Sequence, residues 1–78
     1  MKVKLYATLR RFAPENVELG QAFTIEIDDS TIDGVLKKLG IDANQAKIIM
    51  VNGIRKTNLE YELSSSDTVV IFPPVGGG

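Results

Sequence analysis

Hydrophobic and polar residues alternate along two stretches in the first part of the chain. Residues 2–7 (KVKLYA) and 22–28 (AFTIEID) each place every second side chain on one face, which is the period of a half-buried strand. The apolar sets are Val3, Leu5 and Ala7 in the first stretch and Phe23, Ile25 and Ile27 in the second. Residues 10–21 contain proline, asparagine and glycine, which predicts a connecting loop with room for a helical turn.

A helical period replaces the alternation over residues 30–40 (STIDGVLKKLG). Four apolar residues recur there at the spacing that lines one face of an α-helix, namely Ile32, Val35, Leu36 and Leu39. Ser30 or Thr31 is the expected N-cap, and Gly40 is the expected C-terminal stop. Gly34 costs about 1 kcal/mol relative to alanine inside a helix, so it indicates either close packing against a neighbour or simple tolerance.

A hairpin is predicted after the helix. Ile48–Val51 is an apolar run that ends in Asn52-Gly53, a dipeptide that favours a two-residue hairpin turn, so Ile54–Lys56 is the expected partner strand. Residues 57–67 are predicted as an irregular connection that can hold one turn of helix near Leu59.

The last strand is expected over residues 67–73 (DTVVIFP). Its nearly continuous apolar run indicates a central position in the sheet, and Pro73 ends the pairing because proline has no N–H. The predicted order β-β-α-β-β-β is typical of an α+β protein with a β-grasp, ubiquitin-like mixed sheet and one main helix. We predict a β-grasp domain over residues 1–72 and a C-terminal tail over residues 73–78.

One helix can cover only one face of such a sheet. Alternation directs Tyr6, Val70 and Phe72 to the opposite face, where Ile48 or Met50 is expected to join them. An apolar and aromatic outward face favours a partner-binding patch over a face covered by a loop.

Composition narrows the chemistry that the chain can perform. The 78 residues include no Cys and no His, which removes the common nucleophiles, the usual general base at neutral pH and the preferred zinc ligands. We therefore expect no metal site and no intrinsic enzyme activity. Because no stretch reads as a membrane span or a signal peptide, we expect no membrane association and a cytoplasmic location.

Charge is distributed unevenly, yet it does not predict nucleic-acid binding. The first four charged residues are basic and the next six are acidic, and the net charge is -1. A solvated surface explains this distribution better than a phosphate-binding face.

The C-terminal sequence FPPVGGG, together with four other segments, resembles a known family. These segments are YATLRRF at residues 6–12, the Thr-x-x-x-Val-Leu pattern from Thr31, VNG at residues 51–53 and an Asp before the last strand. Over the whole chain the sequence resembles the MoaD/ThiS family of ubiquitin-like sulfur carriers. The Pro73-Pro74 pair makes it more similar to the branch formed by the molybdopterin synthase small subunit (MoaD-like), whereas Gly76 adds a third glycine to the family's final pair.

This resemblance implies a function for the terminal carboxylate of Gly78. An E1-like activating enzyme (MoeB-like), using ATP and Mg, would adenylate that carboxylate, and sulfur would replace AMP to form a thiocarboxylate. The molybdopterin synthase large subunit (MoaE-like) would accept the sulfur for the molybdenum or tungsten cofactor. The chain itself would bind no cofactor, because partner enzymes supply the catalysis.

The composition of the tail suits this role. Gly77 and Gly78 have no side chains, so they can enter a tunnel too narrow for other residues. Pro73 and Pro74 favour an extended segment, and the six residues from Pro73 to Gly78 can reach about 20 Å. We expect the residues that thread into a partner to be Pro73, Pro74, Val75, Gly76 and Gly77, and those that dock to be Tyr6, Met50, Val70 and Phe72.

Two other functions fit the same sequence. A ubiquitin-like modifier would join the activated Gly78 to a target lysine, and intact-mass measurement after activation distinguishes it from a sulfur carrier. A non-covalent β-grasp interaction or RNA-binding module would keep its function without Gly77 and Gly78.

Overall fold

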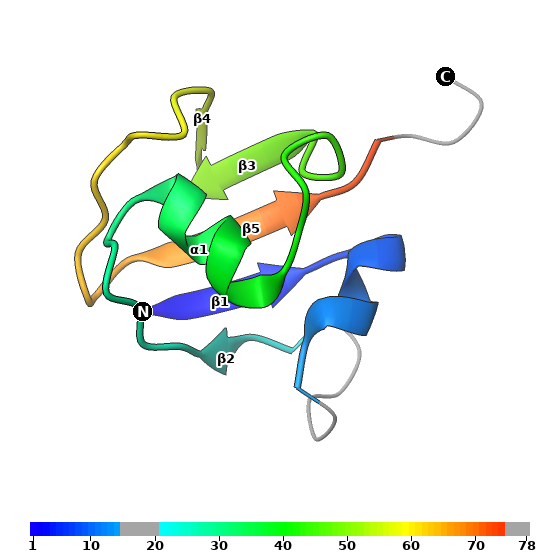
Figure 1. The fold of residues 1–78 in the computed structure, drawn as a ribbon, viewed down its shortest axis with the longest axis horizontal. Helices are drawn as coiled ribbons and strands as arrows, with labels where there is room; N and C mark the ends of the chain where they lie inside the picture. Colours follow the sequence, from blue (N-terminus) through cyan, green and yellow to red (C-terminus); the bar gives the residue numbers. More distant parts are fainter. Residues whose placement is uncertain (15–20, 75–78) are drawn as a thin grey trace.

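A single mixed sheet carries one α-helix on one of its faces (Figure 1). The computed structural model describes residues 1–14 and 21–74. In chain order the elements are β1 (Lys2–Leu5), the 3-10 helix η1 (Ala7–Phe12), β2 (Phe23–Thr24), α1 (Ile32–Leu39), β3 (Ile48–Val51), β4 (Ile54–Lys56) and β5 (Thr68–Phe72). The predicted order of strands and main helix is confirmed.

The five strands are arranged in the order β2-β1-β5-β3-β4. β1 pairs in parallel with β5, whereas the other neighbouring pairs are antiparallel. The predicted central position of the last strand is therefore correct, and the mixed sheet with one main helix is a β-grasp fold. The division into a domain over residues 1–72 and a tail over 73–78 stays a prediction, although β5 does end at Phe72.

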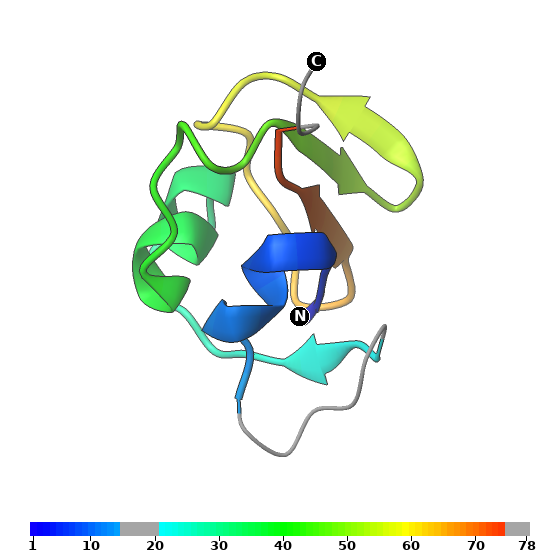
Figure 2. The ribbon, with the colours of Figure 1, turned by 90° about the vertical axis from the view of Figure 1, so that its right-hand side faces the viewer.

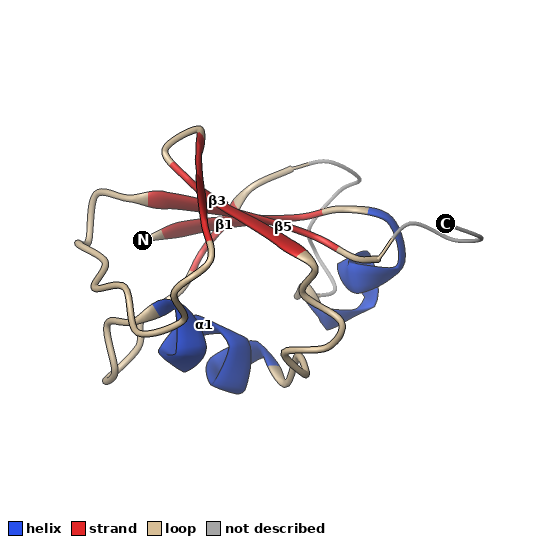
Figure 3. Ribbon diagram, turned by 90° about the horizontal axis from the view of Figure 1, so that it is seen from above, coloured by secondary structure: helices blue, strands red, loops and turns tan. Residues whose placement is uncertain are grey.

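The core lies between the sheet and α1, which are separate layers in Figure 3. Its fully buried members come from both layers and from η1: Val3, Leu9, Ile32, Val35, Leu36, Val69 and Ile71. Alternation along β1 and β5 explains the contribution of the strands, because every second side chain points toward the helix. In the second alternating stretch, Phe23 is buried, whereas Ile25 and Ile27 are only partly buried and pack against the core.

The first strand is shorter than predicted. β1 ends at Leu5, and Ala7 is an exposed residue at the start of η1 with φ 52°, so the prediction that it continues the strand on the face of Val3 and Leu5 was wrong. The helical turn expected in this connection is present, but it begins before the predicted loop. η1 contacts β1 and β5, and Figure 2 shows it at the end of the molecule where both strands finish. Residues 15–20 of the predicted loop lie outside the described part of the chain.

The second strand is also shorter than the predicted seven-residue stretch. Only Phe23 and Thr24 pair with β1, and one further hydrogen bond runs from the Ile25 N–H to the Met1 carbonyl at 3.0 Å. Beyond that bond, the described residues offer no partner strand, and the chain turns toward α1. The alternation of apolar and polar residues thus continues past Thr24, the last paired residue. An unpaired segment that passes along the edge of the core also buries every second side chain in part.

Both ends of α1 follow the predicted capping. Thr31 is the N-cap, and its Oγ1 accepts a hydrogen bond from the Gly34 N–H at 3.1 Å and donates one to Asp29 Oδ1 at 2.9 Å. Gly40 adopts φ 77° at the C-terminus. Close packing explains Gly34, because a Cβ atom there would overlap the Asp29 carbonyl oxygen and lie 2.9 Å from the Asp29 Cβ.

Asn52 joins the β3–β4 turn to the start of β5. Asn52 and Gly53 have φ values of 53° and 84°, as a tight hairpin turn requires. The Asn52 side chain donates to Asp67 Oδ1 at 2.8 Å and accepts from the Thr68 N–H at 3.0 Å. The asparagine of VNG and the aspartate before the last strand are therefore bonded partners.

Replacing Gly34 with alanine should destabilise the fold. The added methyl group meets backbone rather than a flexible side chain, so the segment around Asp29 has to move. We expect the free energy of unfolding to fall by about 1–3 kcal/mol, although alanine is the better helix former. Urea denaturation measures this change, and Lys38→Ala on the exposed side of the same helix serves as the control. A stability equal to that of the control would contradict the close-packing explanation.

Asp67→Asn should change how stability depends on pH. Hydrogen bonds from the Ser64 N–H and from Asn52 keep the pKa of the Asp67 carboxyl below its ordinary value of 3.8. This group therefore stabilises the fold above pH 3.8, and the contribution is lost as the pH falls through the folded-state pKa. Thermal melts should show a lower Tm for the variant at pH 7 and a smaller difference near pH 3. A difference that does not vary with pH would contradict this interpretation.

Candidate functional site

Strand register gathers a set of apolar side chains on the sheet face opposite α1. Met50 pairs with Val70, and Ile48 pairs with Phe72, while the residues beside them in β3 and β5 are buried against the helix. Tyr6 follows β1 on the same outward face. We call these five residues, Tyr6, Ile48, Met50, Val70 and Phe72, the docking face.

Two aromatic rings of the docking face stack on each other. The rings of Tyr6 and Phe72 stack with centroids 4.6 Å apart and an interplanar angle of 12°. Backbone bonds hold both residues in place: the Tyr6 N–H donates to the Ile71 carbonyl at 3.2 Å, and the Lys47 N–H donates to the Phe72 carbonyl at 3.0 Å.

All five residues of the docking face are half-buried. They are covered by one another on the sheet yet remain accessible to water from outside. α1 lies on the other side of the sheet in Figure 3, so it does not cover them. The structure thus brings together Tyr6, Met50, Val70 and Phe72, as predicted, and both candidates Ile48 and Met50 belong to the set. Their role in partner binding stays a prediction.

The chain leaves the sheet beside the docking face. β5 ends at Phe72, and Pro73 and Pro74 follow without strand pairing, half-buried and exposed respectively. The other predicted tail residues, Val75, Gly76, Gly77 and Gly78, lie outside the described residues. The described part of the chain therefore places an aromatic surface directly before the predicted threading segment.

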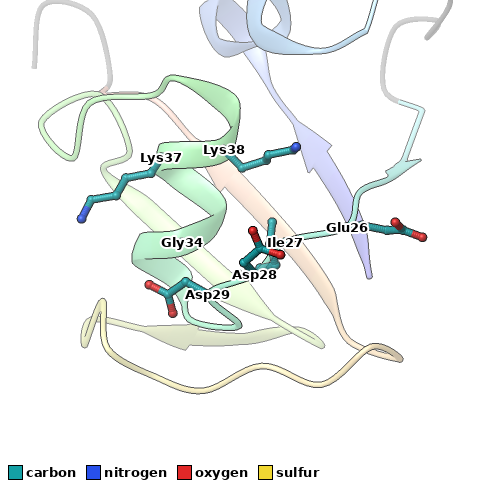
Figure 4. Close-up of a pocket in the computed structure, with 7 residues that line it drawn as sticks. All are labelled: Glu26, Ile27, Asp28, Asp29, Gly34, Lys37 and Lys38. Carbon is teal, nitrogen blue, oxygen red and sulfur yellow. The ribbon is translucent and has the colours of Figure 1, made fainter.

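A pocket of about 600 Å³ lies beside α1 and does not have the arrangement of a catalytic site (Figure 4). Its lining residues are Glu26, Ile27, Asp28, Asp29, Gly34, Lys37 and Lys38. In Figure 4 the charged ends of Lys37 and Lys38 point in opposite directions, and Glu26 points away from both. Lys37 instead pairs with Asp33 at 2.9 Å, a hydrogen bond that raises the pKa of the Lys37 ammonium.

Two absences hold for residues 1–14 and 21–74. No group of three or more carboxylate side chains among them is placed to hold a metal ion. No helix formed by the described residues has the length and apolar character needed to cross a membrane.

Comparison with known protein families identifies the family of this chain. The sequence profile of the ThiS family matches residues 3–78. The chain belongs to the ThiS family. A comparison with curated protein sequences gives no match.

Members of the ThiS family are small ubiquitin-like sulfur carriers and are not enzymes themselves. They work with E1-like activating enzymes. The family assignment thus confirms the predicted ubiquitin-like sulfur carrier. Binding of such an activating enzyme by the docking face stays a prediction.

Sequence reasoning missed two charged neighbours of the docking face. Lys4 places its Nζ 5.2 Å from the centroid of the Tyr6 ring, a cation–π contact. Arg55 pairs with Met50 across the β3–β4 ladder. The second neighbour follows from the sequence, because a two-residue turn at Asn52-Gly53 pairs Val51 with Ile54 and so sets Met50 opposite Arg55.

Truncating Ile71 and Phe72, neighbours in β5, should show by the loss of stability which of them belongs to the core and which to the docking face. Ile71 is fully buried, so Ile71→Ala should lower the free energy of unfolding by about 2–5 kcal/mol. Phe72 is half-buried on the outward side, so Phe72→Ala should cost less than Ile71→Ala. Guanidinium denaturation of both variants tests the order. The reverse ranking would mean that the two faces of β5 have been exchanged.

Proposed function

We propose that the protein carries sulfur for molybdopterin biosynthesis as the small, sulfur-donating subunit of molybdopterin synthase. The observation that carries this proposal is the stacked Tyr6–Phe72 pair, which lies immediately before Pro73 and Pro74. A carrier needs a surface that partner enzymes bind and a chain end that enters their active sites. Here the surface and the beginning of the chain end are adjacent.

The reaction takes place at the terminal carboxylate of Gly78. A carboxylate oxygen attacks the α-phosphorus of ATP on the activating enzyme, and pyrophosphate leaves. Sulfide (HS⁻) then attacks the carbonyl carbon of the acyl adenylate, the bond from that carbon to the AMP oxygen breaks, and AMP leaves with loss of a proton, so that a thiocarboxylate remains. ATP and Mg belong to the activating partner, and the carrier supplies only the acyl group.

The Pro73-Pro74 pair favours molybdopterin over thiamin as the compound for whose biosynthesis the protein carries sulfur. It is the feature that makes the chain more similar to the molybdopterin synthase small subunit than to the thiamin carriers. The large subunit of molybdopterin synthase is accordingly the proposed acceptor of the sulfur. It would bind the same docking face as the activating enzyme, at a different step.

Activation should change the mass of the chain in a defined way. The full chain, incubated with an E1-like activating enzyme, ATP, Mg and a sulfur donor, should gain about 16 Da because sulfur replaces one oxygen. Intact-mass spectrometry measures this shift. A variant with one residue appended after Gly78 is the control, and it should gain no mass while keeping the Tm of the unmodified protein.

Other results of this experiment separate the competing functions. Covalent adducts with target proteins in place of the thiocarboxylate would indicate a ubiquitin-like modifier. Full activity of a variant that lacks Gly77 and Gly78 would indicate a non-covalent module. The thiocarboxylated chain should pass sulfur to the molybdopterin synthase large subunit, and transfer only to the sulfur-accepting enzyme of thiamin biosynthesis would contradict the proposed pathway.

A further inference from the structure

One register row crosses the middle of the docking face and has a cation at each end. Lys4 pairs with Val70, Val70 with Met50, and Met50 with Arg55. The row therefore reads cation, apolar, apolar, cation across four neighbouring strands. With about 4.8 Å between strands, the Cα atoms of Lys4 and Arg55 are about 14 Å apart.

No described residue at the outward positions of these four strands is acidic. The residues that share the outward registers with this row are Lys2, Tyr6, Ile48, Thr68 and Phe72. Asp67 precedes β5, but its carboxylate is engaged by Ser64 and Asn52. Asp28 and Asp29 lie instead beside α1, where they line the pocket of Figure 4. The outward positions of these four strands therefore present positive charge.

Neither cation of the row is neutralised by another described residue. The salt bridge found among these residues joins Lys37 to Asp33 on α1. Lys4 places its ammonium over the Tyr6 ring, and Arg55 is exposed on the edge strand β4. Both charges are therefore available to carboxylates that approach from outside.

We propose that the docking face binds an apolar surface flanked by two carboxylate-bearing side chains, one for Lys4 and one for Arg55, and that the E1-like activating enzyme carries this surface. The proposal deepens the proposed function and rests on it. The apolar residues provide the buried centre of the interface, whereas Lys4 and Arg55 act at its rim. Rim charges of this kind steer association and select among partners more than they add affinity.

Charge reversal of the two rim residues tests the proposal in the full chain. The E1-like activating enzyme of the same genome is the probe, and pyrophosphate release is measured against carrier concentration at two salt concentrations. At about 50 mM NaCl, Lys4→Glu and Arg55→Glu should each raise KM about 10-fold with kcat unchanged. At about 0.5 M NaCl the difference should shrink to about 2-fold, because salt screens exposed charges.

Lys38→Glu is the matched control. It makes the same change in net charge at an exposed position of α1, on the helix side of the molecule. Its KM should stay within about 2-fold of the unaltered chain at either salt concentration. Lys4→Arg keeps the charge beside Tyr6 and should also leave KM unchanged. Arg55→Glu lies on an exposed edge strand, so it keeps the test valid even if Lys4→Glu lowers the Tm.

The outcomes distinguish this inference from the function on which it rests. If the unaltered chain is adenylated and both rim variants show the KM of the Lys38→Glu control, the acidic-partner proposal is overturned while the carrier function stands. If the unaltered chain releases no pyrophosphate with the activating enzyme, the proposed function fails and this inference fails with it. A salt-dependent rise in KM confined to Lys4→Glu and Arg55→Glu supports the proposal.

Discussion

The parallel pairing of β1 with β5 joins the two ends of the chain in the middle of the sheet. Four register pairs connect Lys2–Leu5 with Thr68–Ile71, and the fully buried Val3, Val69 and Ile71 lie within them. This pairing closes a loop of more than sixty residues, a contact that is costly in chain entropy until the rest of the core is in place. The helix side and the outward side of the sheet both depend on its register.

The same register also explains which parts of the site could be predicted from the sequence. Alternation along β5 assigned Ile71 inward and Phe72 outward, and the helix period assigned the inner face of α1, because burial on one side leaves a strong local pattern. The length of β2 and the end of β1 could not be obtained in this way. Both depend on which backbone groups find partners, and that is decided by tertiary contacts such as the bond from Ile25 to Met1.

The motifs that resemble the family have two different roles in the structure: some stabilise the fold, and others form the outward surface. Asn52 and Asp67 are fifteen residues apart and hydrogen-bonded to each other, so they stabilise the junction between a hairpin and the central strand. Tyr6 belongs to the outward surface, where its ring meets Phe72. A sequence pattern alone does not separate these roles, because both kinds of residue are polar or aromatic and both lie at the ends of strands.

Phe72 has two structural roles: it is the last residue of β5, and its ring is one of the two in the aromatic stack. In an enzyme that binds the stack, the residues after Phe72 would therefore always begin at the same position. Under the proposed function, enzymes with unrelated chemistry have to keep their active sites at a common distance from their own carrier-binding surfaces. An activating enzyme and a sulfur acceptor could therefore evolve independently, provided that each kept this distance between its carrier-binding surface and its active site.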